Sequence, residues 1–251
     1  MITQISRMYM LESLRNSGVT LGNILPAFSF FICSWISKIA MKGNEEVISF
    51  LIKGQFLPIS ILLLLFSFAF SSATIYLADM KANKTFNWVK RTGVTPFTYY
   101  VGMGTGVFTL VNVFLVLLLV CYSFLIDVSL VSFLKMVFIS NFVLLALYPL
   151  SFILAGLFKN GKVAQSMLIP IMILFMFSIT MSSMFLTLAG KDPQNYYIFL
   201  LWNPMLYLND SLQLHLNMVN ETWLPEYQYF IILTVFSILL AFIARKVYSF
   251  R

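Results

Sequence analysis

Apolar residues in this chain occur in long runs that short polar segments separate. Six intervals lack Asp, Glu, Lys and Arg and are each about 20 residues long or longer. A helix of that length crosses the roughly 30 Å hydrocarbon core of a bilayer. We therefore expect six transmembrane helices. They are placed near 19–40, 56–78, 98–124, 134–157, 164–188 and 228–246.

Composition supports an all-α membrane protein. Of the 251 residues, 60% are hydrophobic and only 10% are charged, with a mean hydropathy of +0.90. A soluble domain is nearer half apolar and a quarter charged. A membrane β-barrel is also excluded, because its strands alternate in polarity and runs such as 61–66 do not. We treat residues 1–251 as a single transmembrane domain.

The distribution of charge predicts the orientation in the membrane. The net charge is +7, but the cations follow the loops and do not form a nucleic-acid patch. With both termini in the cytoplasm, 11 of the 16 cations lie inside and seven of the nine acids lie outside. This agrees with the positive-inside rule. We therefore expect both termini to be cytoplasmic.

Three polar segments have their own expected structure. Residues 1–18 are expected to form an interfacial helix, with an ordinary basic flank as the alternative. Residues 79–97 form the longest cytoplasmic connection, with four cations and one acid. Residues 189–227 form a long outer loop rich in aromatic residues, in which we expect short helices over 192–215. Asn203-Pro204 is expected to start the later one, since proline fits a first helical turn.

Two glycine-containing motifs have structural explanations. Residues 156–163 nearly match a phosphate-binding loop, but Val163 stands where Ser or Thr is needed, and the segment joins two apolar helices. We interpret it as a tight basic turn in which Gly161 caps the preceding helix. Gly102 and Gly106 form a GxxxG spacing that lets helices approach closely, either within the subunit or between subunits.

Candidate catalytic chemistry is sparse. The chain has one histidine, His215, which excludes a histidine metal cluster. No Asp, Glu, Lys or His lies near the middle of an expected span. Proton-coupled transporters usually keep such a residue there. We expect no enzyme activity, no bound cofactor, and an energy source outside the chain.

Three local patterns, in this order, occur along a six-span chain with a basic first cytoplasmic loop. The first is Asp79-Met80-Lys81-Ala82-Asn83-Lys84-Thr85, followed by Thr95-Pro96-Phe97 and Gly102. The second is Leu154-Ala155-Gly156-Leu157-Phe158-Lys159-Asn160, followed by Ala164-Gln165. The third is Leu201-Trp202-Asn203-Pro204-Met205-Leu206-Tyr207, followed by Asp210-Ser211-Leu212. Together they resemble the permease subunits of type-2 ATP-binding-cassette exporters, although Lys84 replaces a glycine common in the family.

The resemblance implies a transport subunit without its own ATPase site. Such a permease pairs with a second permease, identical or different, and with two cytoplasmic ATPases that bind the ATP. A helix in the first cytoplasmic loop docks on the ATPase. Here the residues expected to couple the two are Lys84, Phe86, Trp88, Val89, Lys90 and Arg91. Their alternative role is anchoring to anionic lipid.

The same resemblance assigns the last outer loop to the outward end of the pathway. The expected outer-gate residues are Trp202, Asn203, Pro204 and Tyr207. Spans rich in Phe and Met favour export of amphipathic peptides or hydrophobic drugs and antibiotics. The expected location is a cell membrane, crossed several times, such as the bacterial plasma membrane. The alternatives are a channel or secondary carrier that works without an ATPase, and a membrane scaffold or intramembrane enzyme.

Overall fold

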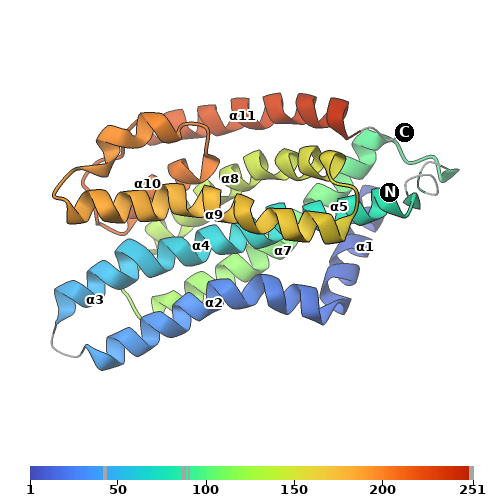
Figure 1. The fold of residues 1–251 in the computed structure, drawn as a ribbon. Coiled ribbons are helices and arrows are strands. Elements are labelled where there is room, and N and C mark those ends of the chain that lie inside the picture. The colour runs from blue at the N-terminus through green and yellow to red at the C-terminus, as the bar shows by residue number, and fades with distance from the viewer. Residues whose placement is uncertain (42–43, 86–88, 90, 249–251) are drawn as a thin grey trace.

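The computed structural model describes residues 1–41, 44–85, 89 and 91–248, and helices are the only regular secondary structure among them (Figure 1). Six helical stretches of this described part are long and apolar enough to cross a membrane. They are Thr20–Ala40, Glu45–Ala82, Pro96–Ser123, Leu130–Leu157, Gly161–Leu188 and Glu226–Val247. The prediction of an all-α fold is confirmed for the described residues, as is the prediction of six helices long and apolar enough to cross a membrane.

The named helices follow the chain in a simple order. The second span, Glu45–Ala82, lies at the centre of the bundle. Before it come α1 (Ile2–Arg15) and α2 (Ser17–Ala40). After it come α7 (Pro96–Ser123), α8 (Leu130–Leu157), α9 (Gly161–Leu188), the 3₁₀ segment η3 (Pro193–Leu200), α10 (Pro204–His215) and α11 (Glu226–Val247).

The second span is one continuous helix at the centre of the bundle. It consists of α3 (Glu45–Leu51), the π-helical turn η1 (Ile52–Phe56), α4 (Leu57–Leu65), the π-helical turn η2 (Phe66–Ser72) and α5 (Ala73–Ala82). The predicted range 56–78 is too short at both ends. Charged residues such as Lys53 and Asp79 mark where a helix leaves the hydrocarbon, and they do not end it.

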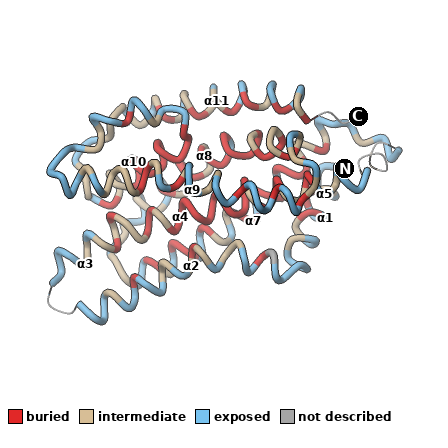
Figure 2. Tube along the Cα trace, viewed as in Figure 1, coloured by how far each residue is buried: buried red, intermediate tan, exposed pale blue. Residues whose placement is uncertain are grey.

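Burial is greatest along this central helix. Nearly every residue of α4 and η2 is buried, with α2, α7, α8 and α9 packed around them (Figure 2). Phenylalanine rings fill the space between helices: Phe68 stacks on Phe114 at 5.1 Å between ring centroids, and Phe70 lies 5.8 Å from Phe175. Such aromatic contacts provide the close packing that holds helices together where lipid offers no hydrophobic driving force.

The outer faces of the bundle are apolar and exposed. On α2 these residues include Trp35 and Ile36, and on α11 they include Leu239 and Phe242. In water such faces would drive aggregation, but in a bilayer they contact acyl chains. Between α7 and α8, the side-chain amides of Asn112 and Asn141 exchange hydrogen bonds of 2.7 and 2.8 Å, a polar link suited to this environment.

The glycine pair Gly102 and Gly106 makes an intramolecular contact with α1. A β-carbon on Gly102 would lie 2.8 Å from Cβ of Ile5, and one on Gly106 would lie 3.0 Å from the carbonyl oxygen of Ser6. The two glycines therefore give α1 the space to cross α7 closely. In the described chain they serve packing within the subunit.

Both chain ends lie at the same end of the bundle. Figure 1 shows α1 and the end of α11 there, with the end of α5 close by. An even number of crossings requires this arrangement. The opposite end carries α3 and the segment from η3 to α10.

Candidate functional site

A cavity of about 910 Å³ extends from the end that carries the termini toward the middle of the bundle. Its walls come from α1, α2, η2, α5 and α9. Ligand pockets of drug size generally enclose about 300–1,000 Å³. The cavity is thus large enough for a drug-sized molecule or several residues of a peptide.

The central helix contributes a polar wall to this cavity. Ser67, Ser71 and Ser72 line it, and all three lie in η2. A π-helical turn changes the register of a helix and is common at functional sites. Here the turn brings hydroxyl groups to the cavity from a helix that is otherwise apolar at this depth.

Asp79 lies on the cavity wall near its open end, where it also contacts α9. Its Oδ1 accepts a hydrogen bond of 2.8 Å from the backbone N–H of Gly161, the first residue of α9. A β-carbon at position 161 would overlap the Asp79 carboxylate. The carboxylate therefore sits at a helix N-terminus, where negative charge is stabilised.

This contact corrects the interpretation of residues 156–163. The prediction that Gly161 caps the preceding helix is wrong, because α8 ends at Leu157 and Gly161 begins α9. The N-cap of α9 is Asn160, whose Oδ1 accepts the Val163 N–H at 2.9 Å. The glycine is needed for the approach of Asp79 and not for a left-handed turn.

The other end of the bundle is filled by α10, which lies buried among the spans. Residues 204–212 are all buried, against α8, α4, α9 and α11. The segment 192–215 thus forms two short helices, η3 and α10, and Asn203-Pro204 starts the second. Asn203 is the N-cap, with its Oδ1 accepting the Met205 N–H at 3.0 Å and its Nδ2 donating to the Phe175 carbonyl at 2.8 Å.

The other residues expected at the outer gate also lie at the start of α10 or just before it. Tyr207 is buried, donates a 3.0 Å hydrogen bond to the Leu201 carbonyl and packs edge-on against Tyr229. Trp202 is partly exposed and makes an edge contact with Phe175 on α9. Together with Asn203 they attach the beginning of α10 to α9 and α11.

Asp210 is a buried acid in α10 that sequence reasoning did not select. Its carboxylate accepts hydrogen bonds from the Tyr229 hydroxyl at 2.5 Å, the Trp223 N–H at 2.9 Å and the Gln194 amide at 3.2 Å. Burial raises the pKa of Asp210 above its usual value, and these donors oppose that rise. The residue thereby joins η3, α10 and α11 in one polar network.

The end of α10 has two further polar attachments. Gln213 donates from Nε2 to the Gly54 carbonyl of the central helix at 2.8 Å. His215 Nε2 lies 2.6 Å from Glu226 Oε1, which also accepts from Ser211 Oγ at 2.9 Å. Burial lowers the pKa of His215.

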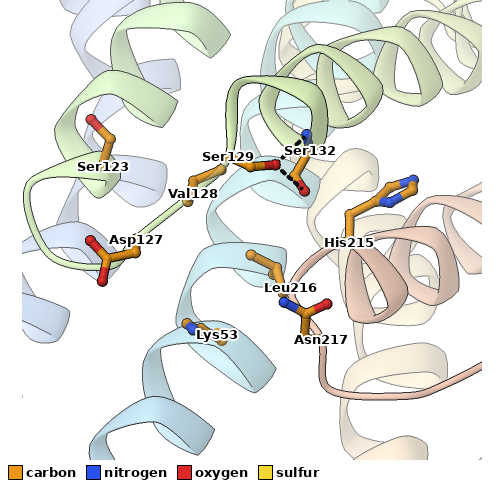
Figure 3. A pocket seen from close by; sticks show the side chains of 9 residues that line it. All are labelled: Lys53, Ser123, Asp127, Val128, Ser129, Ser132, His215, Leu216 and Asn217. Atoms are coloured by element: carbon orange, nitrogen blue, oxygen red, sulfur yellow. Dashed lines mark hydrogen bonds between the residues drawn. The ribbon is translucent and has the colours of Figure 1, made fainter.

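A second pocket of about 490 Å³ lies beside the C-terminal end of α10 (Figure 3). Lys53 of the central helix, Asp127 of the loop after α7, and His215 contribute to its walls. Because the end of α10 forms one side of the pocket, a movement of α10 would change the pocket's shape.

The proposed coupling residues are described only in part. Lys84 is exposed, and its positive φ of +54° breaks the helical path just after α5. Val89 is partly buried against the core, and Arg91 is exposed. Phe86, Trp88 and Lys90 lie outside the described residues. Among the described residues, no group of three His, Cys, Asp or Glu could hold a metal ion.

No protein-family model matches the chain, and no curated protein is found to match it.

Proposed function

We propose that this chain is the permease subunit of an ATP-driven exporter, with both termini and residues 79–97 in the cytoplasm of the cell. One observation supports this most strongly: the 910 Å³ cavity begins at the end that carries the termini, and α10 fills the opposite end. A bundle open at one end and closed at the other fits one state of an alternating-access cycle. The proposed cargo is an amphipathic peptide or a hydrophobic drug.

The proposed energy source for transport rests on the lack of charged residues in the middle of the spans. No Asp, Glu, Lys, Arg or His occurs in the middle of any of the six spans. A carrier driven by protons usually keeps such a residue on its pathway. We therefore assign the driving force to cytoplasmic ATPases, which would dock on the loop that contains Lys84, Val89 and Arg91.

A second permease would complete the pathway. The cavity's serine-bearing wall lies on the central helix, with α2 and α9 contributing the walls beside it. A second copy, or a related permease, facing α2 and α9 would enclose this groove on its remaining side. The helix α1 would lie in the cytoplasmic interface, where its exposed Met8 and Leu11 meet lipid.

Isolation from membranes tests the proposal. The tagged chain, expressed with the coding sequences that neighbour its own, is purified in mild detergent and its partners are identified by mass spectrometry. We expect an ATP-binding-cassette ATPase in stoichiometric amount, and transport by reconstituted vesicles only when they are supplied with ATP. Transport by the chain without an ATPase would replace the proposal with a channel or secondary carrier. Isolation without either partner or transport would favour a membrane scaffold.

A further inference from the structure

The charge of the cavity is opposite to that of the end at which it opens. The neighbouring termini and loops carry an excess of cations, which include Arg7, Arg15, Lys81, Lys84, Arg91, Lys159, Lys162, Arg245 and Lys246. Among the described residues that line the cavity, however, the charged ones are both acids, Glu12 from α1 and Asp79 from α5. Lys81, two residues after Asp79, does not line the cavity. Its ammonium group donates a hydrogen bond to the Gly156 carbonyl.

The two acids reach the cavity from different elements. Asp79 is fixed by the Gly161 N–H at one oxygen, Oδ1. Among the described residues no hydrogen bond to the second oxygen is found, and the side chain is exposed. Glu12 is exposed on α1. A cation that enters between α1 and α5 would therefore meet negative charge on both sides.

The rest of the lining has a polar side and an apolar side. Serines of η2 and the amides of Asn23 and Gln165 provide hydrogen-bonding groups, and the Asn23 Nδ2 atom is buried with no hydrogen-bond partner in the described structure. Phe66, Leu168 and Met172 provide apolar surface.

We propose that this cavity binds a cationic amphipathic molecule. Its ammonium or guanidinium group lies between Glu12 and Asp79, and its apolar body lies deeper, against Phe66, Leu168 and Met172. That the bound cation is the exported cargo rests on the proposed function.

Binding is measured on the purified full-length chain in detergent, before any ATPase is added. The probe is rhodamine 6G, an amphipathic cation, followed by fluorescence anisotropy, and the comparison is fluorescein, an anionic dye of similar size. We expect rhodamine 6G to bind and to weaken as salt is added, and fluorescein to bind at least tenfold more weakly, a difference that one charge-assisted contact can supply.

Two conservative variants locate the cation. Glu12→Gln and Asp79→Asn should each weaken rhodamine 6G binding about tenfold. The matched control Glu45→Gln, an exposed acid at the other end of the central helix, should leave it unchanged. Asn at position 79 can still accept the Gly161 hydrogen bond, and Glu12 lies on the surface of α1, so both variants should fold.

The results separate this inference from the proposed function. Equal binding of the two dyes, or unchanged affinity in both variants, overturns the cation site even if an ATPase co-purifies. Charge-dependent binding by a chain with which no ATPase co-purifies from membranes upholds the site and removes the exporter. Displacement of rhodamine 6G by phosphatidylethanolamine, but not by phosphatidylglycerol, would uphold the cation chemistry and identify a lipid headgroup as its source.

Discussion

The side-chain amide of Gln213 donates a hydrogen bond of 2.8 Å to the backbone carbonyl of Gly54, across 159 positions of sequence. Gly54 lies in the π-helical turn η1, next to α4, and in an α-helical pattern its carbonyl would accept the N–H of the residue four positions later. Here that residue is Pro58, which has none. A buried carbonyl in a membrane helix needs a partner. Gln213 thus compensates for the proline and ties α10 to the central span.

This relationship predicts a coupled effect of two substitutions. Gln213→Leu should destabilise the protein by about 1–3 kcal/mol, because it leaves the Gly54 carbonyl without this donor. In a Pro58→Ala background, the new N–H can serve that carbonyl, and the same substitution should cost less. Thermal unfolding of all four proteins in one detergent gives the interaction energy. Strictly additive effects would disprove the compensation.

A second prediction concerns the contact between Gly161 and Asp79. Gly161→Ala would place a methyl group on the Asp79 carboxylate and force it away from α9. We expect rhodamine 6G binding to weaken about as much as in Asp79→Asn, about tenfold, with a small loss of stability. The matched control is Gly190→Ala, which costs some stability through its positive φ but lies outside the cavity and has nothing within 4 Å of the added β-carbon, so it should leave dye binding unchanged. If Gly161→Ala binds the dye normally, Asp79 does not need this position.

A third prediction is a dependence of stability on pH through His215. Burial holds its pKa below the ordinary 6.5, while Glu226 opposes that shift and Lys135 adds to it. The folded state therefore binds fewer protons than the unfolded state between the lowered pKa and 6.5. Stability should fall as the pH decreases through this window.

The measurement is the thermal midpoint from pH 8 to pH 5, compared with His215→Gln, which lacks the titrating group. The raised pKa of Asp210 acts in the opposite direction, because a folded state that keeps its proton loses stability as the pH rises above 3.8. Comparison of the two proteins cancels this shared contribution. Identical pH profiles would exclude His215 as the source.

A fourth prediction concerns orientation. With Cys33 and Cys121 replaced by serine, single cysteines are introduced at the exposed positions Asn83 and Glu221. Because the two positions belong to opposite ends of the bundle, an impermeant maleimide applied to whole cells should label Glu221→Cys at once and Asn83→Cys only after permeabilisation. Reversed labelling would invert the orientation that the charges predict.

A fifth prediction concerns the docking of the ATPase. The double substitution of Phe86 and Trp88 by alanine should leave membrane insertion normal and reduce ATPase co-purification tenfold or more, since aromatic anchors carry a few kcal/mol in many interfaces. The matched control is Phe97→Ala, an exposed aromatic residue nearby in the sequence. Normal co-purification of the double variant would place the docking surface elsewhere.

The sequence predicted those features that depend on local patterns. The six spans follow from charge-free runs, and the start of α10 follows from Asn203-Pro204, because capping and proline geometry act within a few residues. The burial of α10 was not predictable in this way. Asp210 and Gln213 look like ordinary polar residues of an outer loop, and their partners come from other helices.

The errors have the same origin. The sequence alone places Gly161 at the end of α8, because the partner that fixes its role, Asp79, lies 82 positions away. Pro58, inside an apolar run, is the local signal for the attachment of α10. A proline there leaves the Gly54 carbonyl without its α-helical donor, so another part of the chain is needed to supply one. The central helix is longer than expected because Lys53 and Asp79, the charged residues that bound this apolar run in the sequence, do not end it.

The unbroken course of the central helix has a mechanical consequence. Its 38 residues form a rod of about 55 Å, with Asp79 at one end and the Gly54 carbonyl that holds Gln213 near the other. A tilt of this helix at Asp79 would therefore move α10 as well, because no loop interrupts the helix between the two contacts. The two π-helical turns are the places where such a rod can bend, so they determine how much of a displacement at one membrane surface reaches the other.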